Sequence, residues 1–279
     1  MSCVRLTTAI AISLMTVAPA RAQEPAAIKP TEVIQLFDGK SLANFDGWLV
    51  DHHSSDPERV FSVVDQIDGA PAIRISGKVW GGLLSKNAYR DYRLVVEFRW
   101  GGATWGNRKD RARDSGVLLH AQGRPGNTGK DFNGPWLRSI EFQIIEGGVG
   151  DILPVMGYGD DGAPIRPAVT TTTRKDRDGE TVYDPKGTPA TMSGGRINWW
   201  GRSEDWADKL GFRGAQDVES PGLEWTRIEA VVEGGKLTYF VNGKEVNAAS
   251  DSTFKEGRIM IQSEGAEIYF RRIELQPLR

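Results

Sequence analysis

The sequence predicts an all-β protein, a concanavalin-like jelly-roll sandwich of two antiparallel sheets. Short segments with an apolar residue at every second position recur along the chain, separated by Gly, Asp, Asn and Pro. No long segment has the 3.6-residue period of an amphipathic helix, and the 33 glycines suit many tight turns. Ten or more strands in one domain need two packed sheets to bury their apolar faces.

The alternating segments predict ten strands. They cover residues 33–37, 59–64, 72–76, 92–100, 115–122, 139–146, 225–233, 236–242, 257–264 and 267–275. Gly234-Gly235 and Asn242-Gly243 predict hairpin turns, because Gly and Asn adopt positive φ at low cost. Residues 147–222 are rich in Gly, Pro, Asp and Arg and predict a long loop insertion over one face of the sheet, with a hairpin at 169–183 and an aromatic, charged cluster at 197–206.

The first 22 residues predict a secretory signal peptide. Arg5 precedes an apolar run that is too short to span a bilayer, and small residues at Ala20 and Ala22 mark the cleavage site. We therefore expect one exported domain, residues 30–279, in the periplasm or secreted. Cys3 is the only cysteine and lies in this leader, so disulfides and cysteine catalysis are excluded from the mature chain.

The charge balance argues against a nucleic-acid partner. The formal net charge is −2, and it becomes −4 when the two arginines of the leader are removed. No other segment is long and apolar enough to predict a membrane span. The nine tryptophans suit core packing and, for some of them, stacking on sugar rings.

Polar side chains are expected to gather on the non-core face of one sheet. In the strands at 92–100, 114–122, 139–146 and 257–264, alternation turns the apolar residues inward. The outward set combines carboxyl, guanidinium, amide and imidazole groups: Arg93, Glu97, Arg99, Asp114, His120, Glu141, Gln143, Arg258, Gln262 and Glu264. Amides and a histidine in mid-strand are typical of ligands for a neutral polyhydroxylated substrate, whereas a plain solvent face favours Lys, Thr and Glu.

Glu146 is out of phase with Glu141 and Gln143 in the segment SIEFQIIEGG. One β-bulge between residues 143 and 146 would turn all three side chains to the same face, at the rim where Gly147-Gly148 let the chain turn. The alternative is that the strand ends and Glu146 is solvated.

At these residues the chain resembles laminarinase- and lichenase-like glycoside hydrolases. Their bulged strand carries Glu-x-Asp-x-x-Glu, where the first Glu is the nucleophile and the last is the general acid. Here Gln143 replaces the middle Asp, so the charged partner is absent. This resemblance implies that the Glu141 and Glu146 carboxyls flank one sugar at about 5–5.5 Å from each other.

More of the chain resembles the 3-keto-disaccharide hydrolase family. The shared segments are QLFDGKSL (35–42) with Trp48, GGLLSKNAYRDYRLVVEFR (81–99), SGVLLH (115–120), IEFQIIE (140–146), EWTRIE (224–229), VNGKEV (241–246) and GRIMIQSEGAEIYFRRIEL (257–275). Each segment is short, but the ordered set spans nearly all of the mature chain.

This second resemblance implies a jelly roll that cleaves glycosides oxidised at C3. A ketone at C3 acidifies the C2 proton, so a base can form an enolate that expels the C1 oxygen, and water then adds back. The implied roles are Glu141 as base, Gln143 and Arg99 as donors to the enolate oxygen, and His120 or Glu146 as acid. The other expected substrate-binding residues are Glu97, Asp114, Trp105, Trp136, Trp199, Gln262 and Glu264.

Three questions stay open at this point. A divalent metal ion could take Glu141, Glu146, Asp114 and His120 as ligands, although no spacing requires one. The chain could be a retaining glycoside hydrolase, or a binding module without catalysis in which tryptophans such as Trp105, Trp136, Trp199 and Trp200 carry the affinity. For each of these functions the expected partner is a small carbohydrate. Cleavage of 3-keto-glycosides requires an oxidised disaccharide or glycoside.

Overall fold

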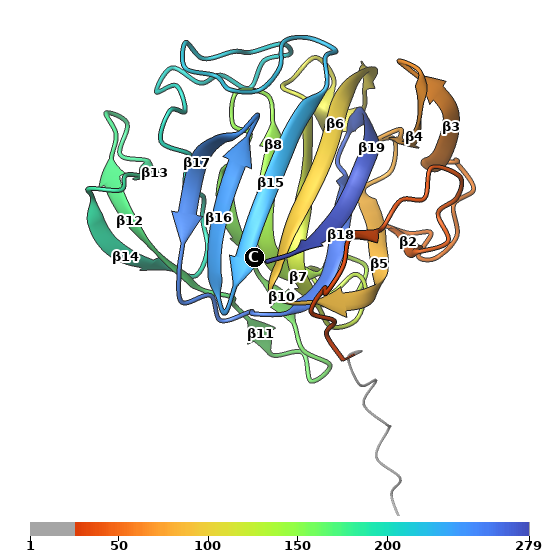
Figure 1. Cartoon of the computed structure of the whole chain (residues 1–279), viewed down its shortest axis with the longest axis horizontal. Helices are drawn as coiled ribbons and strands as arrows, with labels where there is room; N and C mark the ends of the chain where they lie inside the picture. The colour runs from red at the N-terminus through yellow and green to blue at the C-terminus, as the bar shows by residue number, and fades with distance from the viewer. Residues whose placement is uncertain (1–25, 279) are drawn as a thin grey trace, which may run out of the picture.

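A computed structural model describes residues 26–278, so the predicted signal peptide lies outside the described residues. Two antiparallel sheets pack face to face (Figure 1), which confirms the predicted jelly-roll sandwich. The described residues contain one 3₁₀ turn, η1 (Gly106–Arg108), and no α-helix. Nowhere in this part of the chain is there a helix with the length and apolarity to cross a membrane.

The larger sheet has eight strands. They are β1 (Ile34–Gln35), β3 (Phe61–Ile67), β4 (Ala70–Ile75), β6 (Tyr92–Thr104), β15 (Thr226–Glu233), β16 (Lys236–Val241), β17 (Lys244–Ala249) and β19 (Ala266–Pro277). The order across the sheet is β17-β16-β15-β6-β19-β4-β3, and β1 pairs with β19. This sheet lies in front in Figure 1.

The smaller sheet has six strands and lies behind the first. They are β2 (Phe45–Leu49), β5 (Gly81–Tyr89), β7 (Asp114–Gln122), β8 (Arg138–Ile145), β9 (Ile152–Val155) and β18 (Gly257–Ser263). The order is β2-β5-β18-β7-β8-β9. Strands β7, β8 and β18 form its centre and position the candidate site.

The insertion at 147–222 contains short strands as well as loops. Besides β9 they are β10 (Gly157–Tyr158), β11 (Pro164–Ile165), β12 (Val169–Lys175), β13 (Thr181–Tyr183) and β14 (Thr188–Met192). The pairing of β12 with β13 confirms the hairpin predicted at 169–183. Strand β14 adds a third strand to this hairpin.

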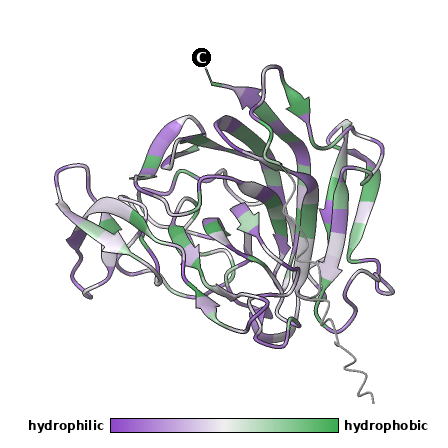
Figure 2. Ribbon diagram, turned by 90° about the horizontal axis from the view of Figure 1, so that it is seen from below, coloured by the Kyte–Doolittle hydropathy of each residue, from purple (hydrophilic) through white to green (hydrophobic). Residues whose placement is uncertain are grey.

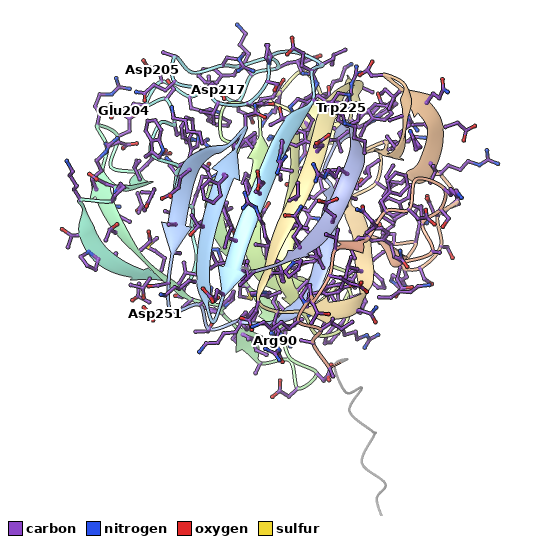
Figure 3. All side chains as sticks on the ribbon, viewed as in Figure 1. Arg90, Glu204, Asp205, Asp217, Trp225 and Asp251 are labelled. Carbon is purple, nitrogen blue, oxygen red and sulfur yellow. The ribbon has the colours of Figure 1, made fainter. Side chains whose placement is uncertain are left out.

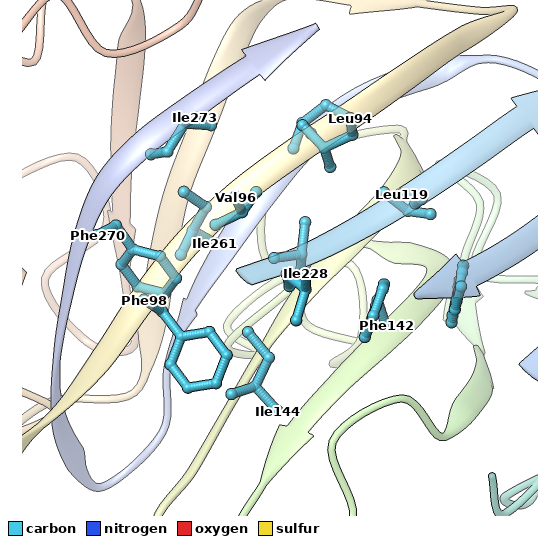
Figure 4. Packing of buried hydrophobic residues seen from close by; sticks show 14 of the residues in the cluster. Leu94, Val96, Phe98, Leu119, Phe142, Ile144, Ile228, Ile261, Phe270 and Ile273 are labelled. Carbon is cyan, nitrogen blue, oxygen red and sulfur yellow. The ribbon is translucent and has the colours of Figure 1, made fainter. Parts of the chain in front are cut away.

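The core lies between the two sheets. Inward side chains such as Phe98, Phe142 and Phe270 are at most 1% exposed, and Figure 4 shows them interleaved with isoleucines, leucines and valines from both sheets. Hydrophobic and hydrophilic residues alternate along the strands (Figure 2), because successive side chains of a strand point to opposite faces. This alternation is the pattern from which most of the long strands were predicted.

Strand β5 was not predicted, because both of its faces are covered. Leu83 packs in the main core, while the adjacent Leu84 packs on the outer face in a second apolar cluster with Leu118 and Met260. Trp136 packs against this cluster and donates its Nε1–H to the carbonyl of Gly81 at 3.1 Å. A strand buried on both faces has adjacent apolar residues and loses the alternating pattern.

The position of β6 corrects one prediction. The sequence analysis placed residues 92–100 on the same polar face as β7, β8 and β18, but β6 pairs with β15 and β19 in the larger sheet. Glu97 and Arg99 therefore lie on the opposite outer face of the sandwich, where Glu97 pairs with Arg271 at 2.6 Å and Arg99 with Asp68 at 2.5 Å. Alternation predicts which side chains of a strand face outward, but it does not predict the sheet that the strand joins.

Candidate functional site

The candidate site lies on the outer face of the smaller sheet, above Gly116 of β7. In the register of the strands Gly116 lies opposite Gln143 on one side and next to Gln262 on the other. A Cβ atom at Gly116 would lie 2.5 Å from Oε1 of Glu141 and 2.2 Å from Oε1 of Gln262. The carboxyl of Glu141 and the amide of Gln262 therefore share the space that the missing side chain leaves.

Asp114 is the first residue of β7, and its two carboxyl oxygens bind two different side chains. Its Oδ1 accepts a hydrogen bond from Nε2 of Gln143 at 2.5 Å, and its Oδ2 pairs with Nη2 of Arg108 at 2.8 Å. Burial raises the pKa of Asp114 to about 7, although the charges of Arg108 and Arg196 oppose this rise. Gln143 thus holds Asp114 in place, and Arg108 of η1 partly neutralises its charge.

Glu141 and Glu264 complete a group of three carboxyls. Burial, and then the charge of Asp114, raise the pKa of Glu141 to about 8, while Arg196 and the nearby Gln262 amide lower it. Glu141 is 4% exposed. Glu264 follows β18 and is half-buried, and its pKa is raised well above the usual range by burial and by the charges of Asp114 and Glu141. We name Asp114, Glu141 and Glu264 the carboxyl cluster.

The amide of Gln262 lies beside the Glu141 carboxyl, and hydrogen bonding between the two side chains lowers the pKa of Glu141. Gln262 is fully buried, and its amide makes no hydrogen bond with any other group within residues 26–278. A buried amide that shares its space with a carboxyl has hydrogen-bonding capacity left for a ligand.

Two arginines from the insertion bind one buried aspartate, and the sequence analysis did not single them out. Arg196 and Arg202 both pair with Oδ2 of Asp151, which also accepts the backbone N–H of Trp199 at Oδ1. Asp151 is fully buried. These residues lie in loops, where no strand periodicity reports their direction. The one signal in the sequence was the aromatic, charged segment 197–206, which contains Arg202.

His120 does not join the site, contrary to the prediction. One extra residue in β7 between Leu119 and Gln122 shifts the register, and His120 adopts a φ of +54° there. Its side chain turns inward, where Nδ1–H donates to the carbonyl of Phe254 at 2.9 Å and the ring meets Tyr92 edge-on at 5.8 Å. Burial lowers the pKa of His120 to about 4, so its imidazole is neutral at pH 7.

The predicted bulge in β8 is also wrong. Strands β7 and β8 pair in continuous register from Glu141 to Ile145, and the strand ends before Glu146. The Glu146 carboxylate is not solvated either. It pairs with the guanidinium of Arg113 at 2.5 Å and accepts the backbone N–H groups of Arg113 and Gly211 at 2.9 Å each. Glu146 thus ties two loops together, away from the face that carries Glu141.

The tryptophans that were expected to bind the sugar lie in three different environments. Trp199 is 1% exposed and packs in the core against Trp200, so it cannot stack on a sugar. Trp136 lies on the outer face of the smaller sheet, stacked on Trp80 at 5.5 Å. Trp105 is 37% exposed, and its backbone N–H donates to the carbonyl of Gly265, the residue that follows Glu264. Trp105 is therefore the exposed aromatic residue next to the carboxyl cluster.

The expected metal-ligand set is not brought together. Asp114 and Glu141 lie in the carboxyl cluster, whereas His120 is in the core and Glu146 is paired with Arg113. Within the described residues, no three or more His, Cys, Asp and Glu side chains form a group that could hold a metal ion. The geometry therefore gives a divalent cation no preformed site in this part of the chain.

The comparison with protein families matches most of the chain. The model of the 3-keto-alpha-glucoside-1,2-lyase-like domain covers residues 32–276. The chain belongs to this family. Membership makes the chain a relative of glycosidase-type enzymes and makes a carbohydrate the expected substrate. A search of curated proteins finds no match to the chain.

Several solved structures are similar to parts of this chain at low sequence identity. A structure described as a candidate glycosyl hydrolase from Parabacteroides distasonis is 15% identical, covers 89% of this chain and 94% of its own, and gives a TM-score of 0.49. The carbohydrate-binding module CBM66 from Bacillus subtilis is 12% identical over 77% of this chain and 91% of its own, with a TM-score of 0.39. The β-glucanase of Bacillus licheniformis is 11% identical over 91% of this chain and 97% of its own, with a TM-score of 0.37. All three scores lie below 0.5, so they carry no functional argument.

Proposed function

We propose that the protein cleaves glycosides that carry a ketone at C3 of the sugar. The proposal is supported by the carboxyl cluster, in which the buried amide of Gln262 lies beside Glu141, in a chain that belongs to this family. Removal of the C2 proton, elimination of the C1 substituent and hydration need a base, a hydrogen-bond donor at the C3 oxygen and an acid at the leaving oxygen. The cluster and its neighbouring amide can supply all three groups.

In this mechanism Glu141 is the base. Its carboxylate takes the C2 proton, and the electron pair moves onto the C3 oxygen to form an enolate. Gln262 donates an amide N–H to that oxygen. When the enolate collapses, the bond between C1 and the leaving oxygen breaks, and Glu264 protonates the leaving oxygen. The oxygen of a water molecule then adds to C1 of the enone while its proton passes to Glu264, and Glu141 returns its proton to C2. This step regenerates the 3-keto sugar and both carboxyl groups.

The pKa values of the cluster suit this exchange of protons. Burial raises the pKa of Asp114 to about 7 and the pKa of Glu141 to about 8, and the pKa of Glu264 lies well above the usual range. Because the three carboxyls interact, these values belong to the group, which holds both protonated and ionised members near neutral pH. An acid and a base can then act in the same site at the same pH.

Two of the three roles inferred from the sequence, the enolate donor and the acid, pass to other residues. Arg99 lies on the other sheet, and His120 and Glu146 are held elsewhere, so Glu264 takes the place of the acid and Gln262 the place of the enolate donor. Gln143 keeps its position beside Gly116 but binds Asp114 instead of the substrate. A retaining hydrolase that uses Glu141 and Glu146 as its pair is disfavoured, because Glu146 is bound to Arg113.

We further propose that the substrate is a small oxidised disaccharide or glycoside and that the protein acts after export. The second point depends on the leader-like residues 1–22 alone. Fractionation of cells that produce the full chain, followed by N-terminal sequencing of the exported form, tests it. A mature protein that begins after Ala22 is the expected result, and an uncleaved cytoplasmic protein would contradict it.

The decisive assay compares oxidised and unoxidised substrates. Trehalose and a β-glucan are offered with and without a ketone at C3, and the released sugar is measured. We expect release from the keto forms only. Release from the unmodified sugars would favour the retaining hydrolase, and binding without release from any of them would favour a carbohydrate-binding module.

The matched variant is Glu141→Gln. The substitution keeps the shape of the side chain and removes the base, so kcat should fall by about 10²–10⁴-fold while the fold is retained. Arg99→Gln, on the opposite sheet, should leave the rate unchanged. Full activity of Glu141→Gln would remove Glu141 from the mechanism.

A further inference from the structure

Two tryptophans that the proposed mechanism does not use are stacked on the outer face of the smaller sheet. The ring centroids of Trp80 and Trp136 lie 5.5 Å apart, with 23° between the ring planes. Both side chains are half-buried, so part of each ring faces solvent. Two stacked rings form a wide apolar surface, and an apolar surface beside a few polar groups is typical of ligand sites.

Trp136 lies next to the carboxyl cluster. It packs against the outer apolar cluster that contains Leu118 and Met260. In the register of the strands Leu118 lies opposite Glu141, and Met260 precedes Gln262 by two residues on the same face of β18. The indole of Trp136 therefore packs on the residues that neighbour the proposed base and the amide donor.

Trp80 lies on the side of the cluster that carries the acid. It immediately precedes β5, whose first residue, Gly81, pairs with Ser263 of β18. Glu264 follows Ser263, so Trp80 and Glu264 are the next neighbours beyond this antiparallel pair. A hydrogen bond from Oγ of Ser263 to the carbonyl of Val79, at 2.7 Å, holds the two segments together at this point.

Hydrogen bonds fix the loop that carries Trp136. Its Nε1–H donates to the carbonyl of Gly81 at 3.1 Å, and Nε1–H of Trp48 in β2 donates to the carbonyl of Gly134 at 2.9 Å. Both bonds tie the loop to the strands at the edge of the smaller sheet. The stacked pair is thus preformed, so a ligand that packs on it does not have to order it first.

We propose that Trp80 and Trp136 bind the ring on the leaving-group side of the substrate. The inference rests on the proposed function, in which the oxidised ring lies above Gly116 and Glu264 protonates the leaving oxygen. A pyranose has an apolar face of C–H groups that packs on an aromatic ring. A ring attached through the leaving oxygen extends from Glu264 over the two indoles. The stacked pair therefore selects among leaving groups and favours a ring over a short alcohol.

The test compares two substrates that differ in the leaving group. Trehalose oxidised at C3 releases a sugar, whereas methyl α-glucoside oxidised at C3 releases methanol. Trp80→Ala should raise KM for oxidised trehalose about tenfold with little change in kcat, because it removes binding that the ground state and the transition state share. KM for the methyl glucoside should keep its wild-type value. Trp80→Phe should retain most of the affinity for oxidised trehalose, since it keeps an aromatic ring.

The control is Trp225→Ala. Trp225 packs on the other face of the sandwich, where the guanidinium of Arg271 lies 4.3 Å from its ring centroid, so its loss should leave both KM values unchanged. An equal rise of KM for both substrates in Trp80→Ala, or no rise for either, would overturn the inference. If Trp80→Ala does not fold, Trp80→Leu replaces it, because leucine keeps apolar volume without a ring, and the same outcomes decide.

A binding experiment separates this inference from the proposed function. Calorimetry measures the affinity of oxidised trehalose for Glu141→Gln, with and without Trp80→Ala, so that the sugar binds without being cleaved. An affinity that depends on Trp80, in a protein whose wild type cleaves no keto-glycoside, would keep the stacked pair as a sugar site and reject the function. Cleavage of both keto substrates, with an affinity that Trp80→Ala does not change, would do the reverse.

Discussion

Gly116 determines the shape of the candidate site at the scale of a single residue. The side chains of Glu141 and Gln262 enter the space where its Cβ would lie. Glycine is needed there because two functional side chains approach the backbone closely, and not because of an unusual φ. The sequence analysis assigned Gly116 no role.

We predict that Gly116→Ala reduces kcat/KM on the keto substrate by about 100-fold or more, because the methyl group displaces the base and the amide donor together. The protein should still fold, since overpacking at one site costs about 1–3 kcal/mol. Gly102→Ala is the control, because a Cβ at Gly102 meets nothing within 4 Å. Equal activity of the two variants would show that the space above Gly116 is not used.

Gly147 and Gly148 follow Glu146, and each position requires glycine for a different reason. Gly147 has a φ of +77°, and a Cβ there would meet the ring of Phe212 at 2.7 Å. A Cβ at Gly148 would lie 2.1 Å from Nη1 of Arg202, the group that pairs with Asp151. The predicted turn is present, and its second glycine also lets Arg202 reach the buried carboxylate.

At the scale of elements, the outer face of the larger sheet is covered by ion pairs. Neighbouring strands place carboxylates between arginines: Glu229 binds Arg93 and Arg227, and Glu274 at the end of β19 binds Arg272. Hydrogen bonding to Arg272, with further contributions from neighbouring amides, lowers the pKa of Glu274 to about 2. This face is a set of mutually satisfied charges that joins β6, β15 and β19.

We predict that Glu274 stabilises the sheet above pH 4.5 and that this stabilisation is lost as the pH falls through about 2. The sign follows because a folded-state pKa below the unfolded one means that the unfolded chain binds the proton more tightly. Glu274→Gln should therefore lower the urea midpoint at pH 6 and have little effect at pH 2. An equal loss at both pH values would exclude the charge as the cause.

At the scale of the whole molecule, a second buried acidic residue, Glu219, lies at the end of the sandwich. Glu219 is 5% exposed and accepts Nε1–H of Trp100 at 2.5 Å, which connects the insertion to the core side of β6. Burial, then the charges of Asp217 and Glu146, raise the pKa of Glu219 to about 8. Asp217 is labelled in Figure 3 at the upper end of the sandwich. A cavity of about 110 Å³ lies between Glu146, Glu219 and Arg113.

We predict that the whole protein loses stability as the pH rises from about 5 to 9. Asp114, Glu141 and Glu219 have folded-state pKa values above their ordinary values, so the folded state binds more protons in this range and is favoured at the acidic end. The melting temperature should fall from pH 5 to pH 9, by about 2–4 °C for each kcal/mol lost.

The variant that tests this prediction is Glu219→Gln, which imitates the protonated acid. It should melt at the wild-type temperature at pH 5 and at a higher temperature at pH 9. A wild-type protein that becomes more stable over the same range would show that the buried carboxyls do not control its pH dependence.

The sequence by itself determined the local features of this protein. Alternation predicted most of the long strands and placed Glu141, Gln143 and Gln262 on a non-core face, because a side chain of a strand can point to only two sides. The ordered family segments predicted the jelly roll and the class of enzyme. Strand β5 was missed because its two buried faces remove the alternation.

Only the tertiary structure decided which of these residues meet. The pairing of β6 took Glu97 and Arg99 to the other sheet, one extra residue in β7 turned His120 into the core, and the regular register of β8 left Glu146 outside the site. Arg196 and Asp151 come together from two loops, through an ion pair between residues far apart in the chain. Strand pairing, register shifts and long-range charge pairs depend on partners distant in sequence, so a local pattern does not contain them.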